Sequence, residues 1–336
     1  MTPANAAHIR TVQARIRKLQ PDIARAYLRA LRQIADLLTT EELEDIVAGR
    51  RTFAELFSDE SLARATAGYR GAIRQSVQDG ARLVVPDLRA QVPRIAAVFN
   101  FLDPRVIQAI RALETSAMDT LAAQVREVAR AYVENGIRDG KGIPAMAREL
   151  RTVIGIAPHQ ERYVDNLARE LREMSPRFKD RVLRDKRYDR LILRAIKEGK
   201  PLSEPKIAQI ASAYTRKFSA YNTEVVTRQI TLDSFREANR LSWEQAVADG
   251  YVDADSVFKV WVHSGLPKDP RPEHVALNGT AVRYNQPFPN GQQVPGEGQF
   301  GCGCSARFEV RPVRRLAAPP RITSRRFAGA AARVGV

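Results

Sequence analysis

The residue types best suited to binding a metal ion gather near the C-terminus. The chain has only four histidines and two cysteines, and the metal-binding candidates among them are His263, His274, Cys302 and Cys304. A loop rich in Gly and Pro, residues 285–301, separates the histidines from the cysteines. Two imidazoles and two thiolates can close a tetrahedral zinc site, and the ion would fix a loop too polar to pack by itself. The sequence therefore predicts zinc here, on a Cys-x-Cys spacing tighter than the usual Cys-x-x-Cys.

Two other interpretations of these residues stay open. In the first, the thiols are small buried groups and His274 is a hydrogen-bonded turn residue, while Asp269 and Arg271 form a salt-bridged turn that orients the loop. In the second, Cys302 is a nucleophile and His274 its base, but no third group is visible to orient them. The chain has no glycine-rich phosphate loop, no GxGxxG after a strand, and no HExxH, GxSxG or kinase motif. We therefore predict no catalytic residue and a protein that is not an enzyme.

The charge balance is strongly basic. With 54 Lys and Arg against 38 Asp and Glu, the 336 residues carry a formal charge of +16. This excess predicts attraction to a polyanion, either nucleic acid or an acidic protein surface. No apolar run approaches the ~18 residues that span a bilayer, and the N-terminus lacks a signal-peptide core. We expect a protein made in a cytoplasm, with no membrane partner.

Two segments carry most of the basic excess. Residues 172–200 are rich in Arg and Lys but interleaved with Asp, which is also typical of a solvated helix face. The tail, residues 313–336, has no acidic residue, so we expect a flexible arm that contacts DNA phosphates or an acidic protein groove, unless it serves solubility alone. Its predicted contact residues are Arg314, Arg315, Arg321, Arg325 and Arg326. Neither segment interleaves aromatic residues, so any DNA contact should be nonspecific.

The hydrophobic pattern predicts helix almost throughout the first 250 residues. Apolar side chains recur every three or four positions, and the expected helices are 22–38, 61–83, 103–136, 143–153, 160–174, 187–198 and 204–249. After Gly250 the period changes to two, which predicts strands in SVFKVWVH and ARFEVRPV. Asn278-Gly279, between HVAL and TAVRY, is typical of a β-hairpin turn.

These elements predict a mainly α protein. We expect an elongated helical body with a small C-terminal α+β module and a basic flexible tail. The expected divisions are a helical body over 1–140, a second helical region over 141–250, the α+β module over 251–312 and the tail over 313–336. The boundary near 140 rests on the turn-like segment GIRDGKG.

Ten residues of the C-terminal module follow a recognisable order. They follow the order of a Trp strand, Asp-x-Arg-x-x-His, an apolar pair before a Gly, a Pro-Gly loop and Cys-x-Cys. They are Trp261, Asp269, Arg271, His274, Leu277, Gly279, Pro295, Gly296, Cys302 and Cys304. This pattern resembles the phage Mu F-like minor head protein family, also called phage head morphogenesis proteins. Upstream, Arg228 matches the family, whereas Gln229 and Ile230 replace its usual Thr and Glu, and Gly303 stands where Arg is common.

The resemblance implies a structural minor head protein of a tailed bacteriophage. Such a protein is made in the host cytoplasm, is present in a few copies per virion inside the head near the portal vertex, and acts in head morphogenesis and, in some phages, in DNA packaging or ejection. The implied partners are the portal protein, the major capsid or scaffold protein, and packaged double-stranded DNA. Two other functions stay open: a metal-dependent nuclease or effector using His263, His274 and Asp269, and a general nucleoid-type DNA-binding protein.

Overall fold

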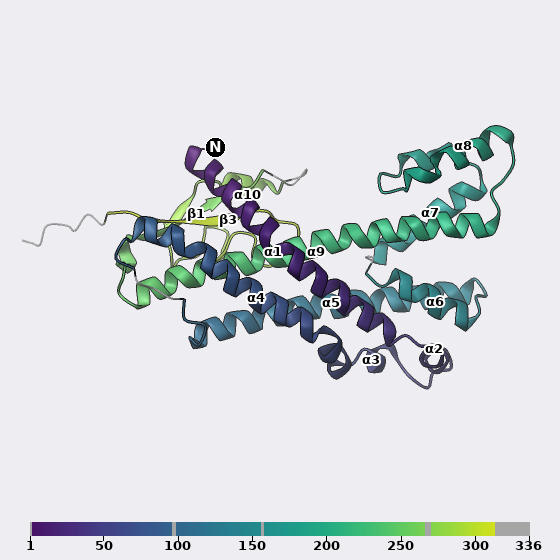
Figure 1. The fold of residues 1–336 in the computed structure, drawn as a ribbon, viewed down its shortest axis with the longest axis horizontal. Helices are drawn as coiled ribbons and strands as arrows, with labels where there is room; N and C mark the ends of the chain where they lie inside the picture. The colour runs from purple at the N-terminus through teal and green to yellow at the C-terminus, as the bar shows by residue number, and fades with distance from the viewer. Residues whose placement is uncertain (1, 96–98, 156–157, 266–269, 313–336) are drawn as a thin grey trace, which may run out of the picture.

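The computed structural model describes residues 2–95, 99–155, 158–265 and 270–312. It confirms the expected fold class, since an elongated assembly of helices carries a small three-stranded antiparallel sheet near the C-terminus (Figure 1). The tail arginines lie outside the described residues.

Four long helices build the body. They are α1 (Pro3–Asp36), α4 (Asp59–Gln91), α5 (Pro104–Arg138) and α9 (Glu204–Ala248). The 45 residues of α9 give it a length of about 68 Å, and it follows the long axis of the molecule from the α7–α8 end to the sheet (Figure 1). This one helix therefore positions both ends of the molecule.

The helix starts follow the usual capping rules. Asp103 accepts a hydrogen bond from the backbone N–H of Arg105 and Pro104 occupies the first turn of α5, while Thr39 accepts one from Glu42 at the start of α2 (Thr40–Val47). A short α3 (Phe53–Leu56) begins with a complete capping box between Thr52 and Glu55.

Two helices are longer than predicted because each continues through a proline. The structure begins α1 at Pro3 and includes Pro21, and α4 continues past Pro86. Both prolines are solvent-exposed, so the carbonyl that each leaves without a helical partner can be hydrated. The opposite faces of these helices bury rows of apolar side chains, and that packing outweighs the local cost of the proline.

The remaining helices close the end remote from the sheet. They are α6 (Ile143–Val153), α7 (Pro158–Arg172) and α8 (Asp189–Glu198), with short 3-10 turns η1 (Pro176–Asp180) and η2 (Lys186–Tyr188) between the last two. One hydrophobic core joins side chains from 1–140 and 141–250, among them Ile23, Tyr69, Leu121, Leu150 and Ile210.

The sheet has the order β2-β1-β3, with β1 (Val257–Val262) between β2 (Ala281–Arg283) and β3 (Ser305–Val310). A 3-10 turn, η3 (Ala254–Ser256), precedes β1. Both outer strands are antiparallel to β1, and Trp261 pairs with Ala306. Trp243 of α9 stacks on Phe308 with ring centroids 5.6 Å apart, so α9 forms part of the core under the sheet.

Two details of the module differ from the predictions. HVAL is part of a short helix, α10 (Pro272–Ala276), so Asn278-Gly279 turns the chain from α10 into β2, which then pairs with β1. Gly279 has a φ of +90°, as this turn requires. In addition, β1 is covered on both faces, because Lys259 and Trp261 are buried as well as Val260.

Candidate metal centre

His274, Cys302 and Cys304 form a compact group of possible metal ligands. The His274 Nδ1 atom lies 3.3 Å from the Cys302 Sγ and 3.7 Å from the Cys304 Sγ. All three ligand atoms lie within 4.8 Å of one another, and all three side chains are buried. α10 supplies the histidine, and the segment leading into β3 supplies the two cysteines.

The geometry fits a metal ion that prefers nitrogen and sulfur. A tetrahedral zinc ion with bonds of about 2.3 Å to sulfur and about 2.0 Å to nitrogen holds these atoms about 3.5 Å apart. The two observed nitrogen–sulfur distances lie on either side of that value. The other ring nitrogen of His274, Nε2, is buried with no hydrogen-bond partner among the described residues. The group could therefore hold a metal ion through Nδ1 and two sulfurs.

The electrostatics of the pair favour one thiolate. A hydrogen bond from the Cys304 thiol and the positive charge of Arg236 together lower the pKa of Cys302 to about 5, against the opposing effect of burial. The same hydrogen bond and burial raise the pKa of Cys304. Because the thiolate is the form that binds metal, one of the two sulfurs is ready to bind at neutral pH.

Arg236 on α9 holds the backbone of the Cys-Gly-Cys segment. Its Nε donates to the Cys304 carbonyl at 2.9 Å, its Nη2 donates to the Cys302 carbonyl at 2.9 Å, and its Nη1 pairs with Asp233 at 2.6 Å. Two turns earlier on the same helix, the Gln229 side chain accepts the backbone N–H of Gly301. Neither role is predictable from the sequence, since nothing local distinguishes Arg236 from the other arginines of the helix.

The aromatic residues of the module pack around the same group. Trp261 is fully buried and meets both His274 and Phe288 in T-shaped contacts, at centroid distances of 5.0 and 5.1 Å. The Lys259 ammonium lies 5.2 Å from the Phe288 ring and donates to the Gln293 carbonyl at 2.8 Å. Burial lowers the pKa of Lys259 to about 8. These contacts fix the Gly/Pro loop against β1.

His263 is not part of the ligand group, which corrects the predicted set of four. The chain leaves β1 at Val262, and the His263 Nδ1 atom accepts the backbone N–H of Gly265 at 3.2 Å. Its own backbone N–H donates to the Asn278 side chain. Strand alternation placed His263 on the same face as Trp261, but local hydrogen bonds after the strand direct the ring elsewhere.

Two other residues of the family-like pattern, Arg271 and Gly279, form hydrogen bonds that hold the backbone of the module. Arg271 precedes α10 and donates from Nη2 to the Phe300 carbonyl at 3.2 Å, and the Gly279 N–H donates to the Trp261 carbonyl at 2.8 Å. Asp269 lies outside the described residues, so the predicted salt bridge between Asp269 and Arg271 stays a prediction.

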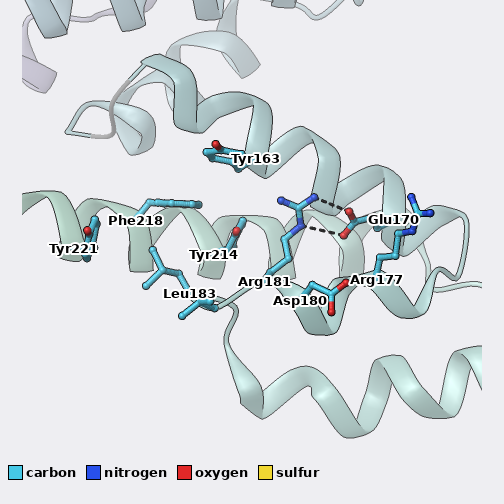
Figure 2. A pocket seen from close by; sticks show the side chains of 10 residues that line it. Tyr163, Glu170, Arg177, Asp180, Arg181, Leu183, Tyr214, Phe218 and Tyr221 are labelled. Atoms are coloured by element: carbon cyan, nitrogen blue, oxygen red, sulfur yellow. Dashed lines mark hydrogen bonds and ion pairs between the residues drawn. The ribbon is translucent and has the colours of Figure 1, made fainter. Parts of the chain in front are cut away.

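A cavity of about 530 Å³ lies at the opposite end of the molecule, between α7, α9 and the segment after η1. Figure 2 shows an aromatic wall from α9, namely Tyr214, Phe218 and Tyr221, beside a bidentate ion pair between Arg181 and Glu170. The spacing of these aromatic residues, four and then three positions, is a helix-face signal that could have been found from the sequence.

Comparison with family models, with curated proteins and with solved structures finds no match to this chain. Among the described residues, no helix is both long enough and apolar enough to cross a bilayer.

Proposed function

We propose that this chain is a structural minor head protein of a tailed bacteriophage, located inside the head near the portal vertex. The observation that supports this most strongly is the convergence of the family-like residues. Trp261, His274 and the two cysteines pack around one point although they are far apart in sequence. Chance matches to a sequence pattern have no reason to meet in space.

The partners in this proposal are the portal protein, the major capsid or scaffold protein, and packaged double-stranded DNA. A 45-residue helix that links two ends of an elongated body suits a component that bridges neighbours in an assembly. The surplus of positive charge suits a particle filled with phosphate.

The metal in this proposal is zinc, and its role is structural. The donor set of one imidazole and two thiols is one that zinc prefers. Three protein ligands leave a fourth position for water or another group, and the burial of all three side chains separates the ion from bulk solvent. The ion would fix the Gly/Pro loop and α10 to the start of β3. We expect about one zinc per chain by elemental mass spectrometry, and its loss in Cys304→Ser or His274→Ala.

His263→Gln is the matched control for the zinc experiment. It removes an imidazole from the same module without touching the ligand group, so it should keep the full zinc content. Equal loss of zinc in all three variants would contradict the three-residue site. Hydrolysis of plasmid DNA that requires both metal and His274 would instead favour a metal-dependent nuclease.

The function is tested by counting copies in particles. Quantitative mass spectrometry of DNA-filled phage heads, with the portal protein as the internal standard, should give a low and fixed number of copies per particle. Absence from filled heads and from empty precursor shells alike would overturn the proposal.

A further inference from the structure

The solvent face of α1 carries a stripe of positive charge. At 100° per residue its exposed cations fall within an arc of about 120°, directly opposite the buried side chains of Ile16, Ile23 and Ile34. The stripe consists of Arg10, Arg17, Lys18, Arg29 and Arg32. Because the opposite face is held in the core, the stripe is presented on a rigid support.

The stripe is not neutralised by neighbouring carboxylates. Among the described residues, none of its five members forms an ion pair. Of the two acidic residues of α1, Asp22 pairs with Arg25, which lies within the same arc, and Asp36 at the end of the helix forms no ion pair with a described residue. Some exposed arginines on the other long helices do have partners, for example Arg64 with Glu60, Arg82 with Asp79 and Arg105 with Asp103. Exposed arginines without an ion pair also occur on other helices, for example Arg89 on α4 and Arg111 on α5, but α1 carries five unpaired cations along one face.

The dimensions of the stripe match duplex DNA. From Arg10 to Arg32 the helix rises about 33 Å, close to the 34 Å of one turn of B-form DNA. We propose that this face of α1 docks on the phosphate backbone of duplex DNA without reading its sequence. The proposal rests on the proposed position of the protein beside packaged DNA, and it names the surface that makes the contact.

Salt dependence of DNA binding tests the proposal. Five phosphate contacts give a slope of log K against log salt of about −4.5 for the stripe alone. We would measure binding of the full chain to a 30-base-pair duplex of arbitrary sequence by filter binding at several NaCl concentrations. Replacing the five stripe residues with Gln should make the slope shallower by about 4 and weaken binding about 10- to 100-fold at 0.1 M salt.

Two control variants distinguish loss of this docking surface from a change in net charge and from misfolding. Arg50, Arg64, Arg82, Arg105 and Arg194 are exposed and ion-paired, so replacing them with Gln removes the same charge and should leave the slope nearly unchanged. Replacing the four stripe arginines with Lys keeps the charge on the same face and should preserve the slope.

Several outcomes would overturn the proposal. They are an unchanged slope in the Gln stripe variant, an equal loss in the ion-paired control, or loss of binding only when the chain is cut after residue 312. Binding of the intact chain to polyglutamate but not to the duplex would assign the stripe to an acidic protein. The particle copy number is independent of these results, so failure here would leave the minor-head proposal standing.

Discussion

Gly296 is the residue where a single added methyl group would disturb the metal centre most directly. A Cβ there would lie 2.7 Å from the Cys302 Sγ and 2.7 Å from an Arg236 guanidinium nitrogen, and its φ is +82°. Gly296→Ala should therefore reduce the zinc content and cost about 1–3 kcal/mol of unfolding free energy beyond the backbone strain. Zinc analysis and urea denaturation measure the two effects.

Gly298→Ala is the control for that change. Gly298 belongs to the same loop and has a φ of +67°, but nothing lies within 4 Å of its Cβ position. The variant should show the strain of a left-handed alanine, about 1–2 kcal/mol, with normal zinc content. If both variants lost zinc equally, backbone strain rather than crowding at the sulfur would be the cause.

His8 should make stability fall in mild acid. Its Nε2 lies 2.9 Å from the Ser305 hydroxyl, where burial, reinforced by the charge of Arg307, lowers the pKa to about 4 from 6.5. The unfolded chain therefore takes up this proton first, and stability falls as the pH drops from about 6.5 to about 4, by up to about 1.4 kcal/mol per pH unit.

Denaturation at pH 7.5, 5.5 and 4.5 measures this dependence. His8→Gln keeps a polar group near Ser305 and should remove the His8 part of the slope over this window. An identical slope in the variant would assign the acid sensitivity to other groups.

The ligands could be predicted from the sequence because histidine and cysteine are rare in this chain. Arg236 could not, since its role arises from a tertiary contact with a segment 66 residues away along the chain. His263 shows the opposite failure. Strand alternation predicts the orientation of side chains only as far as Val262, where β1 ends. The orientation of the His263 ring is instead set by a hydrogen bond that it accepts from Gly265 after the strand.

Among the elements, the crossing of α4 and α9 depends on a glycine. A Cβ on Gly80 would lie 3.0 Å from the Cβ of Ala238, so the two helices approach closely here. Gly80→Leu should destabilise the protein by about 1–3 kcal/mol, because the neighbouring backbone has no room to move aside. Thermal denaturation followed by circular dichroism measures the shift.

Gly71 in the same helix is the matched control. Its Cβ position is open, so Gly71→Leu should raise stability by up to about 1 kcal/mol through helix propensity alone. A similar loss in both variants would mean that α4 needs flexibility at these positions rather than a close approach to α9.

Helix existence was predictable from periodicity, but two helix boundaries were not. Pro21 and Pro86 are local signals for an end, yet packing of Ile16 and Leu88 on the far side of each helix keeps both helices continuous. Asn278-Gly279 does form a turn, as the sequence predicts. The sequence does not show the strand pairing, in which β1 is the central strand and pairs with both β2 and β3.

At the scale of the whole molecule, composition and period were enough to predict an elongated helical protein with a small sheet. They could not show that one core extends across residue 140, since that depends on which helix faces meet. Nor could they show that α9 reaches both ends: its predicted range is 204–249, but the length of a helix does not say which elements pack along it.

Both tryptophans lie at one end of the molecule, so tryptophan fluorescence reports on that end. Trp243 and Trp261 are almost fully buried, and both lie at the sheet end, against β3 and against His274 respectively. Their emission therefore reports on that end alone, and Trp261 reports on the surroundings of the metal ligands. Unfolding of α7 and α8 would leave this signal untouched while far-ultraviolet ellipticity fell, so a comparison of the two spectra would detect unfolding at the end remote from the sheet.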